Sequence, residues 1–202
     1  MRFIEFNLYS PALCMGERTK GGLFRPCCKT IRYSQISGAL RKKFGVNEIH
    51  AVGYLEEGNG YNRTEYLIYS PRDRLRGISK IPLQAEFLTN VHGKVYVLEN
   101  GFTSKLPEQF EIFMGAFISR GLGLCKLKKV RIAETEPLRK GLLKTRIPVD
   151  KIEIFGIRRV KRPVYGYLFQ PTSPTGGTYV LSLFEGSEVI APEIFISLSE
   201  RR

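Results

Sequence analysis

Several residue types on which enzymes and metal sites depend are scarce in this chain. The 202 residues include no tryptophan, only two histidines (His50 and His92) and only two aspartates (Asp73 and Asp150). The four cysteines have neither a paired C-x-x-C spacing nor a histidine near them, so we expect reduced thiols and no zinc site. No Walker loop, G-x-S-x-G elbow or H-E-x-x-H helix is present. We therefore assign no catalytic residue, no metal and no cofactor, and nothing in the sequence demands an enzyme.

Long apolar runs are absent as well. No stretch of about eighteen apolar residues exists, so the sequence predicts no transmembrane helix. Glu5 and Asn7 interrupt the N-terminal segment where a signal peptide would need an apolar core. We expect a cytoplasmic protein without a membrane partner.

Positive charge, by contrast, is abundant and concentrated. The formal net charge is +13. Residues 120–162 hold 14 Lys or Arg against 4 acids, a net of +10, whereas residues 163–202 hold 2 against 4, a net of −2. Such an excess favours a polyanionic partner, either nucleic acid or an anionic membrane surface. A merely solvated charged surface is the alternative.

A glycine-rich segment runs directly into a basic one between Ser119 and Arg131. Gly121 and Gly123 have no Cβ, so the backbone there can adopt positive φ or lie against a sugar-phosphate chain. Before them, five apolar residues follow the spacing of one helix face, which predicts a helix over 107–118: Phe110, Phe113, Met114, Phe117 and Ile118. A glycine pair that follows a helix and enters a strand reverses the dinucleotide-binding order. The segment instead predicts a cradle for a phosphate backbone.

The order of the remaining elements predicts an α+β fold. Ser34 can begin a helix that Gly45 ends, and the doubled Lys128-Lys129 implies a β-bulge in the basic strand. Strands are expected over 2–8, 49–57, 64–69, 81–88, 94–98 and 124–132, with residues 58–63 joining the second and third as a hairpin. This order fits a ferredoxin-like (RRM-like) βαββαβ unit with a hairpin insertion over residues 1–132. Residues 133–202, loop-like to 151 and strand-like over 152–169 and 178–184, are expected to form a small β-rich C-terminal subdomain packed on it.

Two segments resemble a known family. Gly115 followed by Ser119-Arg120-Gly121-Leu122-Gly123 resembles the glycine-rich signature of CRISPR-associated RAMP proteins, and residues 33–41 are similar to the segment that opens their first helix. The resemblance implies an RRM-like fold whose glycine loop grips crRNA. It is closest to the group-five subunit, which holds the 5′ handle of crRNA, caps the effector backbone and contacts the backbone and large subunits.

The resemblance and the charge pattern together nominate the residues expected to contact RNA. Their backbone or cationic side chains suit phosphate groups, and they are Arg120, Gly121, Gly123, Lys126, Lys128, Lys129, Arg41, Lys42, Arg18, Lys20, Arg158 and Arg159. Five tyrosines interleaved with basic residues are candidates to stack on unpaired bases: Tyr33, Tyr61, Tyr66, Tyr165 and Tyr167.

Three alternatives remain open at this point. One is a group-seven backbone subunit that binds the crRNA spacer, with Asp73 as the candidate for target-RNA cleavage. Another is a metal-independent pre-crRNA endoribonuclease with His50 or His92 as its base, although the short chain and the lack of a suitable histidine near a loop argue against it. The third is a basic interaction protein unrelated to CRISPR systems.

Overall fold

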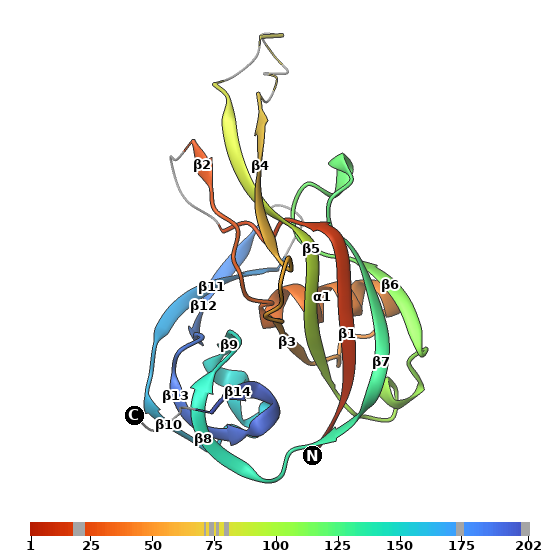
Figure 1. The fold of residues 1–202 in the computed structure, drawn as a ribbon, viewed down its shortest axis with the longest axis vertical. Helices are drawn as coiled ribbons and strands as arrows, with labels where there is room; N and C mark the ends of the chain where they lie inside the picture. Colours follow the sequence, from red (N-terminus) through yellow and green to blue (C-terminus); the bar gives the residue numbers. More distant parts are fainter. Residues whose placement is uncertain are drawn as a thin grey trace.

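The computed structural model describes residues 1–17, 23–70, 72, 75, 77–78, 81–172 and 176–198. Arg18, Lys20 and Asp73 of the sequence predictions lie outside these residues. The described chain forms a large sheet with one α-helix behind it and a group of shorter C-terminal strands beside it (Figure 1). The strands and the α-helix, in chain order, are β1 (Arg2–Leu13), β2 (Phe24–Arg25), α1 (Tyr33–Phe44), β3 (Ala51–Leu55), β4 (Arg63–Tyr69), β5 (Leu83–Leu98), β6 (Gln109–Phe113), β7 (Leu124–Glu134), β8 (Leu138–Leu143), β9 (Ile147–Pro148), β10 (Arg159–Arg162), β11 (Tyr165–Pro171), β12 (Gly177–Leu183), β13 (Glu188–Pro192) and β14 (Ile196–Ser197). Four short 3₁₀ helices complete the described elements: η1 (Thr103–Lys105), η2 (Ile118–Arg120), η3 (Val149–Phe155) and η4 (Glu193–Phe195).

The main sheet has the strand order β2-β5-β1-β7-β6, and β3 and β4 also pair with β5. The first half of β5 pairs with β4 and its second half with β3, so β3 and β4 lie end to end along one edge of β5. The predicted hairpin between 49–57 and 64–69 is therefore wrong. The predicted runs 81–88 and 94–98 are one continuous strand, because Val91, Gly93, Val95 and Val97 carry the buried alternation through the supposed break.

The predicted first helix is confirmed as α1. It ends at Gly45, which has the left-handed φ of 70° that suits a residue without Cβ. Ile36 and Leu40 on its inner face are fully buried against Phe6 and Leu8 of β1 and their neighbours. This single apolar face, rather than intrinsic helix propensity, fixes α1 to one side of the sheet.

The predicted second helix over 107–118 is wrong. Residues 109–113 form β6, in which Phe110, Ile112 and Met114 just beyond it are buried while Glu111 and Phe113 are exposed. The apolar residues thus satisfy a period of two as well as the helical spacing, and a segment this short cannot separate the two periods. Aromatic and β-branched residues favour the strand once β7 offers a partner.

The basic strand over 124–132 is confirmed as β7, together with its bulge. Glu5 of β1 pairs with Arg131 and Phe6 pairs with Lys129, so Val130 is the additional residue on β7. Cys125 and Leu127 before the bulge face the core.

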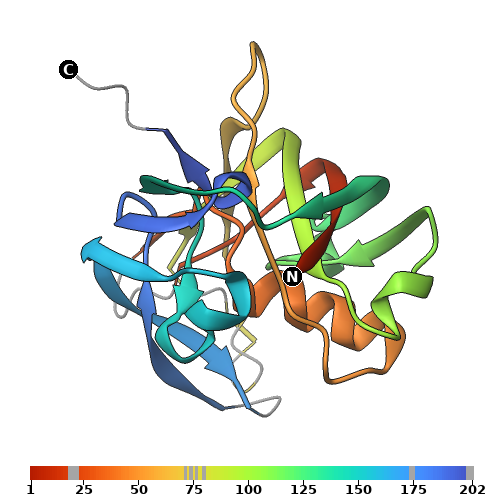
Figure 2. The ribbon, with the colours of Figure 1, turned by 90° about the horizontal axis from the view of Figure 1, so that it is seen from below.

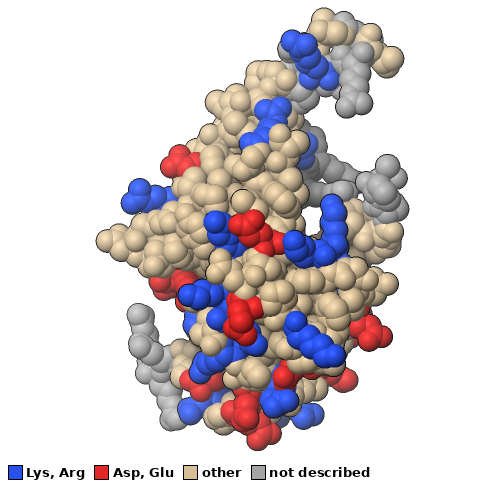
Figure 3. Space-filling model, turned by 90° about the vertical axis from the view of Figure 1, so that its right-hand side faces the viewer, with Lys and Arg blue, Asp and Glu red and all other residues tan. Residues whose placement is uncertain are grey.

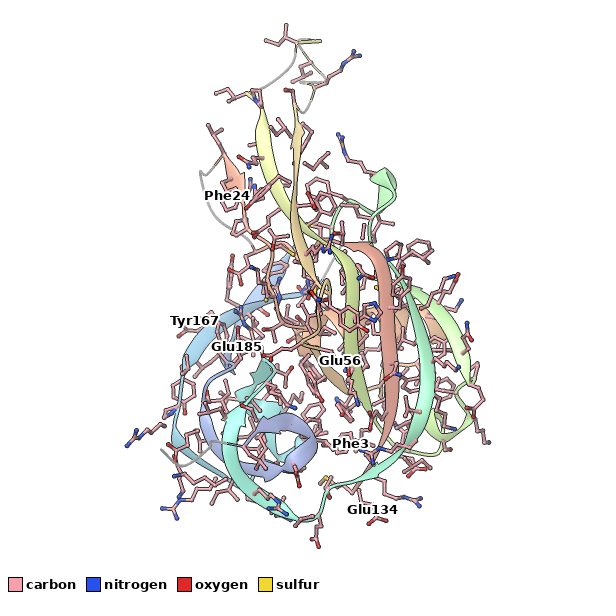
Figure 4. All side chains as sticks on the ribbon, in the orientation of Figure 1. Phe3, Phe24, Glu56, Glu134, Tyr167 and Glu185 are labelled. Carbon is pink, nitrogen blue, oxygen red and sulfur yellow. The ribbon has the colours of Figure 1, made fainter. Side chains whose placement is uncertain are left out.

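The C-terminal strands form two small sheets, β10-β13-β8-β14 and β11-β12-β9. The loop expected over 133–151 contains β8 and β9, and β13 and β14 were not predicted. Phe3 of β1 packs against Phe155 and Phe195, with ring centroids 5.8 and 5.1 Å apart. Phe3, labelled in Figure 4, therefore marks where the C-terminal part covers one end of the sheet face opposite α1 (Figure 2). None of the helices in the described part of the chain has the length and apolarity needed to cross a bilayer.

Candidate nucleic-acid interface

The glycine loop, Gly115–Gly123, joins β6 to β7 and is fastened to β1. The N–H of Met114 donates to the Gly123 carbonyl (2.9 Å), and the N–H of Gly123 donates to the Ala12 carbonyl (2.8 Å). The N–H of Ala116 donates to the Cys14 carbonyl (2.7 Å). The loop is therefore positioned by the sheet itself.

The three glycines of this loop differ in what surrounds them. Gly115, Gly121 and Gly123 all have φ near +90°, at 88°, 87° and 89°. A Cβ on Gly115 would lie 2.4 Å from the Cys14 carbonyl oxygen, and one on Gly123 would lie 2.3 Å from that of Met114. A Cβ on Gly121 would meet no described atom within 4 Å. The protein's own backbone therefore fills the space beside Gly115 and Gly123, and only Gly121 leaves that space open to a ligand.

The tip of the loop presents a cation. The guanidinium of Arg120 lies 4.7 Å from the ring centroid of Tyr69, at the end of β4, and the Phe117 ring lies 5.2 Å from the same tyrosine. Arg120 is exposed and forms no ion pair with any carboxylate in the described ranges. Its charge is thus held in place by an aromatic ring but not neutralised.

A groove of about 390 Å³ separates the glycine loop from the first half of α1. We name it the α1 groove, and it is lined by Gly16, Arg32, Ser34, Gln35, Gly38, Ala39, Lys42, Phe113, Met114, Gly115, Ile118, Phe169 and Pro171. Gly38 leaves the helix surface open, because a Cβ there would meet nothing within 4 Å. Lys42 is exposed, and among the described residues no carboxylate pairs with it.

Two buried polar atoms of residues lining this groove have no partner among the described residues: Nε of Arg32 and Oε1 of Gln35. The rest of the Arg32 guanidinium is fixed, because Nη2 donates to the carbonyls of Met15 and Gly16, each at 2.9 Å. Buried polar groups are seldom left unpaired in native proteins. An unpaired donor and an unpaired acceptor thus belong to residues that line the same groove.

Sequence reasoning did not assign a role to Gln35 or Arg32. A signal was present, because Gln35, Gly38 and Lys42 follow the i, i+3, i+7 spacing of one helix face. That polar stripe lies opposite Ile36 and Leu40.

The predicted RNA-contacting residues separate into groups in the structure. Lys42, Arg120 and Gly121 lie at the α1 groove and the glycine loop. Lys126 and Lys128 alternate with the core-facing Cys125 and Leu127, so they lie on the sheet face opposite α1. The structure therefore does not bring all the predicted cations to one path.

Two further predicted cations are held by other groups of the protein. Arg41 donates through Nε to the Ile49 carbonyl (3.0 Å) and through Nη2 to the Tyr33 hydroxyl (2.9 Å). The ammonium of Lys129 lies 3.1 Å from Glu108.

The last pair of predicted cations, Arg158 and Arg159, lies at the start of β10, at the opposite end of the molecule from the glycine loop (Figure 1). On the face shown in Figure 3, acidic and basic side chains are interspersed rather than gathered into one patch. On this face the positive charge therefore does not form one continuous surface.

The His50 side chain contacts Tyr33 of α1. Its Nδ1 lies 2.7 Å from the Tyr33 hydroxyl. Burial, and then the positive charges of Arg41 and Lys151, lower its pKa below the ordinary value for histidine. The ring is therefore neutral at neutral pH and tied to the helix that it neighbours.

No protein-family model matches the chain, and no curated protein matches its sequence. In three dimensions the chain is similar to a chain in the cryo-EM structure of the type III-B Cmr-beta bound to cognate target RNA, and equally in the structure that also holds AMPPnP. Both alignments cover 94% of this chain and 86% of the other, with 12% sequence identity and a TM-score of 0.56. The two chains therefore share a fold.

Proposed function

We propose that this protein is an RNA-binding subunit of a CRISPR effector ribonucleoprotein, and that its α1 groove and glycine loop hold the sugar-phosphate backbone of the crRNA 5′ handle. The observation that carries the proposal is a pair of exposed cations, one in the groove and one in the adjoining loop, that have no carboxylate partner among the described residues. Lys42 lines the groove, and Arg120 belongs to the loop that forms its other wall. Phosphate groups are the ligands that such cations bind most readily.

Two further polar groups of the residues that line the groove favour RNA over a simple anion. Nε of Arg32 is a donor for a phosphate oxygen, whereas Oε1 of Gln35 needs a donor. The ribose 2′-hydroxyl is such a donor, and it is the group that distinguishes RNA from DNA. Gly121 leaves room for a backbone to approach closely.

The arrangement of strands supports the group-five assignment. We take residues 1–132 as an RRM-like RAMP domain, in which β7-β1-β5-β3 form the central sheet and β6 stands in place of the second helix of a βαββαβ unit. The paired β4 and β5 project from the body (Figure 1). Residues 133–202 form the smaller C-terminal subdomain, and the backbone and large subunits of the effector are the protein partners. The proposed role is to hold RNA at the end of the backbone and includes no cleavage step.

The test is RNA binding measured by fluorescence anisotropy over about 50 to 200 mM salt. The labelled RNA carries the 3′ end of the CRISPR repeat found beside the gene, which directly precedes the spacer and forms the 5′ handle, and spacer RNA of the same length is the comparison. The double variant Lys42→Gln/Arg120→Gln should weaken binding at least about tenfold. It should also reduce the slope of log K against log salt by about 1.4, which is two single-strand phosphate contacts at about 0.7 each.

The matched control is Arg158→Gln/Arg159→Gln, which removes the same charge at the other end of the molecule. It should change affinity less than about twofold, because only close contacts release counterions. Equal losses in the two double variants would overturn the groove as the binding site. Equal affinity for repeat-derived and spacer RNA would overturn the handle assignment and favour a backbone subunit instead.

A further inference from the structure

A second recess lies on the other face of the main sheet, where no helix covers it. We name it the sheet-face pocket; it has a volume of about 350 Å³ and is lined by Asn7, Leu8, Tyr9, Glu56, Tyr61, His92, Gln109, Lys126, Leu127 and Lys128. Its polar residues come from β1, β5, β6, β7 and the loop between β3 and β4. It shares no lining residue with the α1 groove.

Strand register places an aromatic ring beside a cation at the centre of this pocket. Tyr9 of β1 pairs with His92 on one side and with Lys126 on the other. The Tyr9 and His92 rings meet edge to face with centroids 5.2 Å apart, and 41% of Tyr9 is exposed. One step along the sheet, Asn7 pairs with Lys128. An aromatic ring, an amide and two ammonium groups thus come from two adjacent cross-strand pairs on the same face of the sheet.

The loop above the pocket holds the aromatic groups rigidly. The Tyr61 ring stacks on His92 with centroids 3.8 Å apart and planes 12° from parallel. The N–H of His92 donates to Oδ1 of Asn62 (3.0 Å), and Nδ2 of Asn90 donates to the Gly60 carbonyl (2.9 Å). The pocket is therefore built before any ligand arrives, which reduces the entropic cost of binding.

The cations of the pocket are only weakly neutralised. Lys128 is exposed and has no ion-pair partner among the described residues, and Lys126 reaches only Glu111, at 3.6 Å across half-exposed side chains. Glu56, labelled in Figure 4, is the one carboxylate among the lining residues, and it lies 3.9 Å from Lys94. Two ammonium groups against one carboxylate favour an anionic ligand.

We propose that the sheet-face pocket binds an unpaired nucleotide of a single-stranded nucleic acid, with the base on Tyr9 and the flanking phosphates at Lys126 and Lys128. Base stacking on an aromatic ring beside cations is how proteins bind single strands with little sequence preference. A duplex hides the faces of its bases, and an apolar peptide would leave Lys128 and Asn7 without partners. The α1 groove lies on the other side of the sheet. The nucleic acid bound in the sheet-face pocket is therefore a second segment, distinct from the RNA handle of the proposed function.

The experiment measures binding of labelled oligouridine, oligothymidine and an abasic oligonucleotide of equal length. Tyr9→Leu removes the ring from an exposed position, and Tyr9→Phe keeps it. The matched control is Tyr167→Leu, because Tyr167 in β11 is an exposed tyrosine that the structure places in the lining of neither recess. Tyr9→Leu should weaken binding of oligouridine or oligothymidine at least about fivefold, from a stacking contribution of about 1 kcal/mol or more. Tyr9→Phe should stay within about twofold of the parent, and the abasic strand should not respond to Tyr9→Leu.

All variants are measured in the parent chain and in the Lys42→Gln/Arg120→Gln background, so that the α1 groove does not mask a weaker site. Ultraviolet crosslinking followed by peptide mass spectrometry should place the adduct on the peptides of Tyr9 or His92. Equal affinities of Tyr9→Leu and Tyr167→Leu in both backgrounds would overturn this proposal while leaving the groove untouched. A Tyr9 effect without any effect of the groove variant would instead overturn the proposed handle site alone. A response to oligouridine but not to oligothymidine identifies RNA as the ligand, and equal responses identify any single strand.

Discussion

Replacing Gly123 by alanine should destabilise the protein far more than the same change at Gly121, although both residues lie in one loop at almost the same φ. An L-residue in this left-handed region costs about 1–2 kcal/mol at either position. At Gly121 there is no further energetic cost, because the new methyl group would meet open space. At Gly123 the methyl group would lie 2.3 Å from the Met114 carbonyl oxygen, so the backbone must move.

That movement breaks the hydrogen bonds that fasten the loop. Met114 N–H to the Gly123 carbonyl and Gly123 N–H to the Ala12 carbonyl (2.9 and 2.8 Å) each contribute about 1 kcal/mol. The free energy of unfolding should thus fall by about 3–4 kcal/mol in Gly123→Ala and by about 1–2 kcal/mol in Gly121→Ala. The smaller entropy of the unfolded chain is common to both variants and cancels in their difference.

Urea unfolding followed by far-ultraviolet circular dichroism measures this difference. With a slope of about 2 kcal/mol per molar urea, the midpoints of the two variants should differ by about 1 M. Gly121→Ala should fold normally and allow its RNA affinity to be measured. Midpoints that coincide, or a less stable Gly121→Ala, would refute the assignment of Gly123 to backbone packing and of Gly121 to the ligand side.

Two more predictions concern buried residues on the sheet face opposite α1. Glu5 is 1% exposed, and its carboxylate lies 2.8 Å from the Lys94 ammonium and 2.9 Å from the Arg131 guanidinium. Burial raises the pKa of Glu5, but the hydrogen bonds and charges of these two cations outweigh burial and hold this pKa below its ordinary value. The Glu5 carboxylate therefore stabilises the fold at pH values above its pKa in the unfolded chain, and this contribution is lost as the pH falls through its pKa in the folded protein. Glu5→Gln should lower the free energy of unfolding by about 1–2 kcal/mol at pH 7 and flatten the loss of stability below about pH 5 in urea titrations. An unchanged pH profile would contradict this. Phe195→Ala should lower the free energy of unfolding by about 3–5 kcal/mol in one cooperative calorimetric transition, since this ring packs on both Phe3 and Phe155; two separate transitions would contradict a shared core.

Local signals in the sequence were sufficient for α1 and β7. α1 has a capping glycine and one apolar stripe, and β7 has alternating core residues up to a predicted bulge. The predicted second helix was wrong because Phe110 and Met114 fit a period of two as well as the helical spacing, and only pairing with β7 decides between them. The hairpin failed for a related reason: β3 and β4 both prefer the long β5 to each other, and such register is a property of distant segments.

The candidate site could be nominated from the sequence only where its residues are neighbours in the chain. The glycine loop and its arginine were nominated because they are consecutive, and Lys42 because it lies in a run of cations. Tyr9 was not found, because its value as a stacking surface depends on Lys126, which is 117 positions away in the chain and adjacent only through the pairing of β1 with β7. Composition likewise shows how much positive charge exists but not which face of a sheet receives it.

The cations of the basic strand β7 do not form one continuous surface, because they are divided between the two faces of the sheet. Residues 124–132 read as one cationic stretch, but alternation turns Lys126 and Lys128 away from α1, while Lys129 pairs with Glu108 and Arg131 with Glu5. Lys42 lines the α1 groove and Lys128 lines the sheet-face pocket, and neither has an ion-pair partner among the described residues. A single strand of nucleic acid passing through the α1 groove cannot reach Lys128 without rounding an edge of the sheet. If both proposals hold, the subunit contacts two separate stretches of nucleic acid, and the sheet between them keeps these stretches apart.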